Sequence, residues 1–108
     1  MALKSKIVFI LFSITLACCT TPLLIPNDTD VSRAQAKWGG TDLAALQKGH
    51  MLYMNKCGSC HYLHRPQKYS EEKWRQEMPE MSSRAKLSSD EQELVLHYLL
   101  TMREAQRN

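Results

Sequence analysis

The sequence predicts a small all-α domain. Apolar side chains recur at helical spacing in three segments, and no stretch of four or more residues alternates as a strand would. The 108 residues have room for one domain, and they contain no internal repeat and no low-complexity tract. We therefore expect about three helices.

The first helix is expected over about Asp42 to Lys56. Thr41 or Asp42 can serve as its N-cap, because either side chain accepts a hydrogen bond from a backbone N–H of the first turn. Leu46 and Tyr53 share one face of this helix, and that face is expected to pack on the core.

The second helix opens at Ser70, with Glu71 and Glu72 in the first turn, where the helix dipole favours negative charge. Pro79 is expected to end or distort it, because proline lacks the N–H that an interior position donates. One stripe of this helix carries three large side chains: Trp74, Met78 and Met81.

The third helix has the clearest signal. Ser88 and Glu91 form the Ser-x-x-Glu pattern of a capping box, in which each side chain accepts from the other residue's backbone N–H. The apolar positions that follow at helical spacing are Leu94, Val95, Tyr98, Leu99 and Met102.

The first 17 residues are typical of a signal peptide. Lys4 and Lys6 supply a positive start, residues 7–16 form an almost unbroken apolar run, and the small residue Ala17 ends it. The run is shorter than the roughly 20 apolar residues that a transmembrane helix needs, and a short uncleaved anchor is the alternative. We expect export to the periplasmic side.

Two cysteines follow the signal peptide. The junction before Cys18 is similar to the cleavage box of bacterial lipoproteins, which predicts a lipid on Cys18 and a membrane-tethered protein. Cys19 is the second candidate, and ordinary cleavage without lipidation is the alternative. Residues 18–40 lack periodicity and end in two glycines, so we expect a flexible tether ahead of a domain at residues 41–108.

Charge excludes one class of partner. The chain has 14 basic and 11 acidic side chains, and removal of Lys4 and Lys6 with the signal leaves 12 basic ones. A nearly neutral domain lacks the basic surface that nucleic-acid binding needs. We expect no nucleic-acid partner.

One short motif carries chemistry. Cys57-Gly58-Ser59-Cys60-His61 matches the attachment signature of c-type haem. Two cysteines at this spacing reach the two vinyl groups of one haem, and the adjacent histidine then lies under the iron. We therefore expect one covalent haem c through Cys57 and Cys60, with His61 as an axial ligand. The core of so small a domain is limited, so the ring would also complete it.

Other interpretations of Cys-x-x-Cys fit less well. A zinc site needs two further ligands, and His50, His64 and His97 are not paired at ligand-like spacing. A thioredoxin-like redox pair follows a strand, and no strand pattern precedes Cys57. A disulfide across two residues would close too short a loop to stabilise the chain much.

The domain resembles the small bacterial monohaem cytochromes c of class I, which have His/Met ligation. Gly49, Tyr53 and Cys57 reproduce the Gly-x-x-x-aromatic-x-x-x-Cys spacing of that family's first helix, where the glycine allows close contact with the C-terminal helix. Tyr98 lies where the family places an aromatic residue against the first helix. The resemblance therefore implies a cytochrome c-like arrangement of helices around the haem.

The resemblance also implies residues around the iron. Trp74 and Met81 are similar in spacing to the tryptophan and distal methionine of one bacterial subgroup, which implies Met81 as the second axial ligand and Trp74 as a packing residue at the haem edge. Met78 is the other candidate ligand. We favour Met81, because Pro79 should end the helix and leave Met81 on an extended segment. The Pro66 carbonyl is expected to accept the imidazole N–H, with a plain turn proline as the alternative.

The function that the resemblance implies is one-electron transfer and not catalysis. An iron with two axial protein ligands cannot bind a substrate without losing one of them. Two alternatives stay open. An open distal site would suit a haem sensor or a peroxidase-like protein, and a haem subunit of a larger membrane oxidoreductase complex would relay electrons internally. The expected partners are redox proteins, including such a complex.

Overall fold

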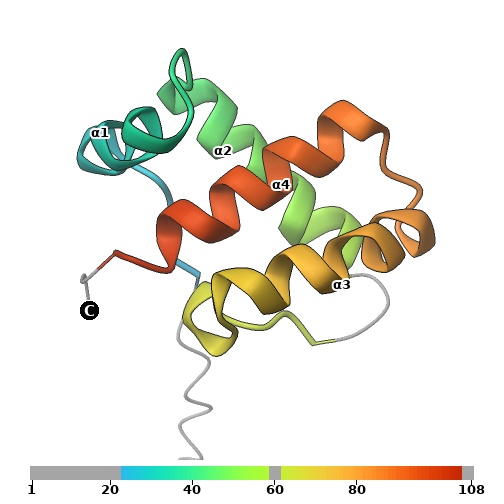
Figure 1. The fold of residues 1–108 in the computed structure, drawn as a ribbon. Helices are drawn as coiled ribbons and strands as arrows, with labels where there is room; N and C mark the ends of the chain where they lie inside the picture. The colour runs from blue at the N-terminus through green and yellow to red at the C-terminus, as the bar shows by residue number, and fades with distance from the viewer. Residues whose placement is uncertain (1–22, 59–61, 106–108) are drawn as a thin grey trace, which may run out of the picture.

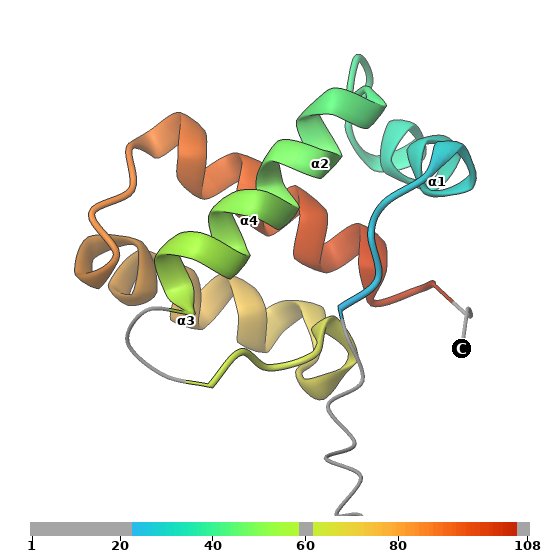
Figure 2. The same ribbon diagram turned by 180° about the vertical axis from the view of Figure 1, so that it is seen from behind.

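The computed structural model describes residues 23–58 and 62–105, and these ranges contain helices and no strand. The predicted all-α class is confirmed. The α-helices, shown in Figure 1 and from behind in Figure 2, are α1 (Asp28–Lys37), α2 (Leu43–Leu52), α3 (Glu71–Arg84) and α4 (Ser89–Met102). Two short turns complete the described secondary structure: a π-helical turn, η1 (Tyr53–Cys57), and a 3₁₀ turn, η2 (Pro66–Lys68).

Helix α2 and the turn η1 together form the first predicted helix. Asp42 is the N-cap, and its carboxylate accepts a hydrogen bond of 2.8 Å from the N–H of Ala45. Helix α2 packs across α4 (Figure 1). A Cβ added at Gly49 would overlap the carbonyl oxygen of Leu94 and lie 2.9 Å from the Cβ of Tyr98. The predicted close approach of the two helices at this glycine is therefore confirmed.

Helix α3 begins at the predicted residue, with the Ser70 side chain accepting from the N–H of Lys73. The expectation that the helix ends at Pro79 is wrong, because it continues to Arg84. The proline removes one backbone hydrogen bond, but packing against α4 holds the helix on both sides of it. The side chains buried along α3 are Trp74, Met78 and Ser82.

The turn between α3 and α4 satisfies the last carbonyls of α3. The N–H of Leu87 donates to the Ser82 carbonyl at 2.9 Å, and the N–H of Lys86 donates to the Ser83 carbonyl at 3.2 Å. This pairing is a Schellman motif. Lys86 has a φ of 57°, a left-handed conformation that usually belongs to glycine. Helix α4 then opens with the predicted capping box at Ser88.

The expectation of a flexible tether over residues 18–40 is wrong for residues 28–37, which are helical. Residues 28–37 form α1, whose capping box pairs Asn27 with Asp30. Asp30 and Ala34 are fully buried. The sequence pattern did not indicate this helix, because the side that it buries carries an alanine and an aspartate in place of large apolar residues.

Helix α1 lies beside the C-terminal end of α4 (Figure 1). Arg33 donates to the Thr101 carbonyl at 3.2 Å, which ties the two helices together. Just after α1, the ring of Trp38 stacks on the ring of His97 with 4.0 Å between centroids. The folded unit therefore includes α1 and does not begin at residue 41.

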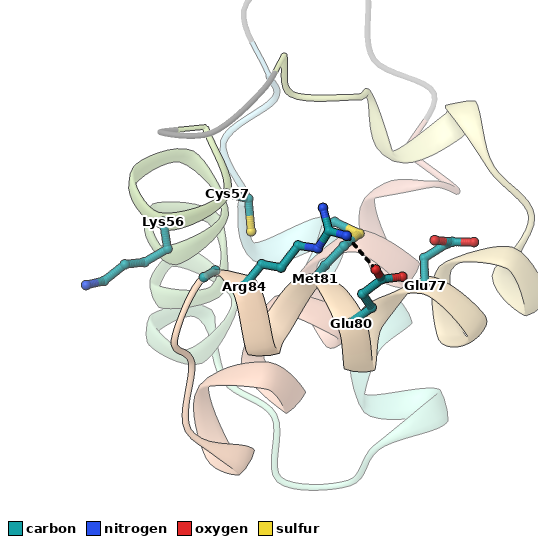
Figure 3. A pocket seen from close by; sticks show the side chains of 7 residues that line it. Lys56, Cys57, Glu77, Glu80, Met81 and Arg84 are labelled. Atoms are coloured by element: carbon teal, nitrogen blue, oxygen red, sulfur yellow. Dashed lines mark hydrogen bonds and ion pairs between the residues drawn. The ribbon is translucent and has the colours of Figure 1, made fainter.

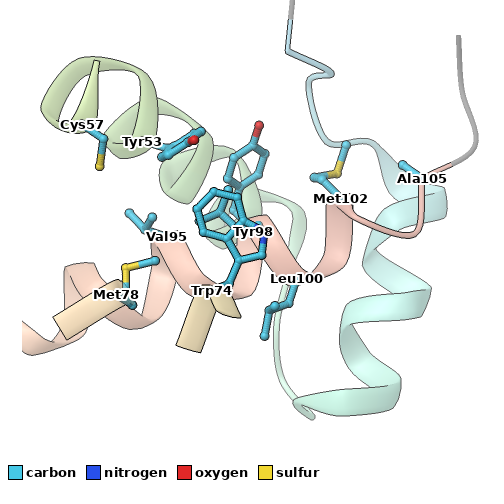
Figure 4. Close-up of a cluster of buried hydrophobic side chains, with 10 residues drawn as sticks. Tyr53, Cys57, Trp74, Met78, Val95, Tyr98, Leu100, Met102 and Ala105 are labelled. Carbon is cyan, nitrogen blue, oxygen red and sulfur yellow. The ribbon is translucent and has the colours of Figure 1, made fainter. Parts of the chain in front are cut away.

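The turn η1 and the helices α3 and α4 share a core that contains three aromatic rings (Figure 4). Tyr53, Trp74 and Tyr98 have no exposed surface. The ring centroid of Tyr53 lies 6.2 Å from that of Trp74 and 5.9 Å from that of Tyr98. Cys57 belongs to the same buried cluster, so the first cysteine of the attachment motif lies against the packed interior.

Candidate functional site

The attachment motif begins at the end of η1. Cys57 is the last residue of that turn and is only 4% exposed, because the π-helical turn directs it toward the core. Cys60 and His61 lie outside the described residues, so their predicted roles as second thioether residue and axial ligand stay predictions. The described chain resumes at Tyr62 and leads to η2.

A pocket of about 490 Å³ lies beside Cys57 (Figure 3). Its volume is within the range of about 300–1,000 Å³ that is typical of sites for small molecules and cofactors. Cys57 extends from η1 and Met81 from α3, so two sulfur-bearing side chains from different elements line one space. The lining residues are Lys56, Cys57, Glu77, Glu80, Met81, Arg84 and Ala85.

Helix α3 separates its two candidate methionines by face. Met78 is 1% exposed and lies in the core with Trp74 and Val95. Met81 is partly exposed and lines the pocket. Three residues correspond to about 300° of helix, so the two side chains leave the helix about 60° apart, one toward the core and one toward the pocket. The extended segment predicted to carry Met81 is absent from the described chain, since Met81 is within the helix.

The charged side chains of α3 at the pocket form pairs on the helix surface. Arg84 donates to the Glu80 carboxylate at 2.7 Å, and Lys73 donates to the Glu77 carboxylate at 2.6 Å. Both pairs span one helical turn and are at least a third exposed, so they contribute little to stability. The positions of Glu77, Glu80 and Arg84 at the pocket were not predicted from the sequence, although the spacing of four from Glu77 to Met81 places these two on the same face of a helix.

The segment after the motif is attached to the core at two backbone carbonyls. The Tyr53 hydroxyl donates to the His64 carbonyl at 2.6 Å, and the Trp74 indole N–H donates to the Pro66 carbonyl at 2.8 Å. Burial, the largest cause, raises the pKa of the Tyr53 phenol well above its usual value, so the hydroxyl stays protonated and remains a donor.

This geometry bears on two predicted site residues. Pro66 is buried and its carbonyl already accepts from Trp74. A carbonyl oxygen has two lone pairs, so its predicted bond to His61 stays a prediction. Trp74 lies in the core and is not among the residues that line the pocket, so its predicted contact with the haem edge also stays a prediction.

The described residues suit a covalently attached haem. The Cys57 thiol, which can form a thioether, lines a pocket of suitable volume. The Met81 sulfur, a possible iron ligand, lines the same pocket from α3. Cys57 also belongs to the buried cluster that contains Tyr53 and Trp74, so a ring attached to it would lie at the edge of the core. The arrangement can therefore bind a haem and hold it partly out of water.

A sequence profile of the family described as dihaem cytochrome c matches residues 53–108, slightly more than half of the chain. The match begins at Tyr53, so it includes the attachment motif, α3 and α4. No curated protein and no solved structure matches the chain.

Proposed function

The chain belongs to the dihaem cytochrome c family. From this membership we propose that it is a one-electron carrier and that this chain binds a single haem c. The membership makes it a haem-binding electron-transfer protein. The resemblance found in the sequence pointed to the monohaem class, whereas the family description names two haems. The chain contains one Cys-x-x-Cys-His motif, and this count supports one haem here.

We propose that Cys57 and Cys60 form the thioethers and that His61 and Met81 are the axial ligands. The observation that carries this proposal is the shared pocket of Cys57 and Met81. Met78 has no such access, since it is 1% exposed among core side chains. Because α3 continues through Pro79, the proline itself does not favour Met81 over Met78.

Haem bound in this pocket supplies an iron that takes up and releases one electron. His61 and Met81 would fill both axial positions, which disfavours substrate binding, and a methionine ligand raises the reduction potential. The packed core lies on one side of Cys57, and Met81 and Cys57 are both part of regular elements, α3 and η1, which would limit their movement. These features suit a carrier better than an enzyme.

The proposal is tested on protein produced in a host that attaches c-type haem. We expect haem staining that survives denaturation, a mass increase of one haem, and one iron per chain. Low-spin, six-coordinate spectra in both oxidation states support the carrier, whereas a high-spin or five-coordinate spectrum would favour the haem sensor or peroxidase-like alternative. A mass equal to the unmodified chain, or two irons per chain, would contradict the proposal.

We also propose that the protein is exported and held at the periplasmic side of a membrane by a lipid on Cys18. In the described part of the chain, no helix is long and apolar enough to cross a membrane. Leu23 and Leu24 pack against the core, so Cys18 lies five positions before the first residue that packs there. Fully extended, these five positions span at most about 18 Å, which would keep the haem domain close to the membrane surface.

The anchor is tested by measuring the intact mass of the protein purified from the membrane fraction. We expect the mass of the wild-type protein to include a lipid on Cys18. The Cys18→Ala variant should lack this added mass and should no longer associate with the membrane. An unmodified N-terminus after Cys19 would contradict the lipid anchor.

The redox partner is proposed to be another protein. Co-purification after gentle solubilisation distinguishes a free carrier from a subunit of an oxidoreductase complex.

A further inference from the structure

The chain on the C-terminal side of His61 is held by two buried side-chain donors. Tyr53 donates to the carbonyl three residues after His61, and Trp74 donates to the carbonyl five residues after it. Both rings have no exposed surface, and they contact each other edge to face at 6.2 Å. Two adjacent, rigid donors therefore fix two nearby points of one short segment.

The bond from Tyr53 also links the two sides of the attachment motif. Tyr53 begins η1, which ends at Cys57, and its hydroxyl reaches the backbone of His64. The bond therefore joins residues that are 11 positions apart and closes a loop that contains the whole motif. Because a backbone carbonyl accepts the bond, the attachment acts on the path of the main chain and does not depend on the side chain at position 64.

We propose that Tyr53 and Trp74 are positioning residues for the axial histidine. By holding the His64 and Pro66 carbonyls, they fix the main chain next to His61 and so set the orientation of its imidazole plane at the iron. This inference rests on the proposed function. It assigns to the two aromatic side chains a polar role in addition to their packing.

Tyr98 is a matched control within the same core. Its ring is also fully buried and lies 5.9 Å from that of Tyr53. Its hydroxyl, however, has no hydrogen-bond partner among the residues that the structure describes. Replacement of either tyrosine by phenylalanine removes one buried oxygen and keeps the ring, but only the change at Tyr53 releases a carbonyl beside the motif.

The test compares the holoprotein with its Tyr53→Phe, Trp74→Phe and Tyr98→Phe variants. The hyperfine-shifted haem methyl resonances of the oxidised protein depend on the orientation of the axial imidazole, and the reduction potential is measured on the same samples. We expect Tyr53→Phe and Trp74→Phe to change the spread and order of the methyl resonances and to shift the potential. Tyr98→Phe should reproduce the wild-type pattern.

A merely structural role predicts a different result, namely lower unfolding midpoints with unchanged methyl resonances and potential in the Tyr53 and Trp74 variants. That result would overturn the inference, as would equal changes in Tyr53→Phe and Tyr98→Phe. If one variant does not accumulate, the other still decides the outcome. Failure of the proposed function is distinguishable, because the wild-type protein itself would then lack covalent haem.

Discussion

At the scale of single residues, burial distinguishes side chains that the sequence leaves equivalent. Met78 and Met81 both follow Trp74 at helical spacing, and both lie within α3. Met78 belongs to the core, whereas Met81 belongs to the pocket next to Cys57. Truncation of Met78 should therefore affect mainly the stability of the fold, whereas truncation of Met81 should affect mainly the haem iron.

We expect Met81→Ala to abolish the weak methionine-to-iron charge-transfer band of the oxidised protein and to lower the reduction potential. Met78→Ala should keep the band and lower the free energy of unfolding by about 2–5 kcal/mol, as is typical when a core methionine is truncated. Optical spectra, potentiometry and denaturant unfolding of both variants measure these effects. The reverse pattern would assign the iron to Met78.

Lys86 has a backbone conformation that is unfavourable for a residue with a side chain. It occupies the left-handed position of the turn after α3 with a φ of 57°. Glycine adopts this conformation without the Cβ clash, so Lys86→Gly should raise the free energy of unfolding by about 0.5–1 kcal/mol. Lys86→Ala, which keeps the Cβ, is the control and should not stabilise. Chemical denaturation of the holoproteins compares them, and equal stability of the two variants would contradict the expectation.

At the scale of elements, the crossing of α2 and α4 depends on one missing side chain. Gly49→Ala would place a Cβ against the Leu94 carbonyl, which belongs to a helix backbone and cannot rotate away. We expect a loss of about 1–3 kcal/mol in the free energy of unfolding, as for other overpacked sites. Gly39→Ala is the control, because no atom lies within 4 Å of its Cβ position. Thermal or denaturant unfolding of both variants tests the crossing, and similar stabilities would contradict it.

At the scale of the whole molecule, α1 and the residue that follows it, Trp38, contact α3, α4 and the residues just after α4. Lys37, at the end of α1, pairs with Glu71 of α3 at 3.1 Å and with Glu104 after α4 at 3.3 Å. Trp38 adds the ring stack on His97 of α4. Helix α1 is therefore part of the same folded unit as the pocket. One of the contacts that attach it involves the titratable ring of His97.

This contact predicts a pH dependence of stability. Burial, the largest cause, lowers the pKa of His97, while the pKa of an unfolded histidine lies near 6.5. The unfolded chain therefore binds the proton first as the pH falls, and the free energy of unfolding should decrease from pH 7 downward. His97→Phe keeps a ring for Trp38 and removes the titration, so it should lose less stability between pH 7.5 and 5.5. An equal loss in wild type and variant would exclude His97 as a source.

Much of the fold was predictable because its signals are local. The caps at Asp42, Ser70 and Ser88 and the apolar faces of three helices depend on residues within one or two turns of each other. The attachment motif is equally local, since five consecutive residues define it. Gly49 was also recognisable, although its role involves a distant helix, because the spacing from Gly49 to Cys57 follows a family pattern.

What remained depended on contacts between distant parts of the chain. Pro79 breaks an isolated helix, but packing against α4 outweighs one lost hydrogen bond, so α3 continues. The second half of the expected tether is helical because α2 and α4 provide a surface for α1, which its own sequence does not reveal. The sequence by itself thus determined the helical class and the haem-binding motif through short-range patterns. The different burial of Met78 and Met81 and the attachment of residues 64 and 66 were decided only by the tertiary structure, because burial and direction arise only when helices meet.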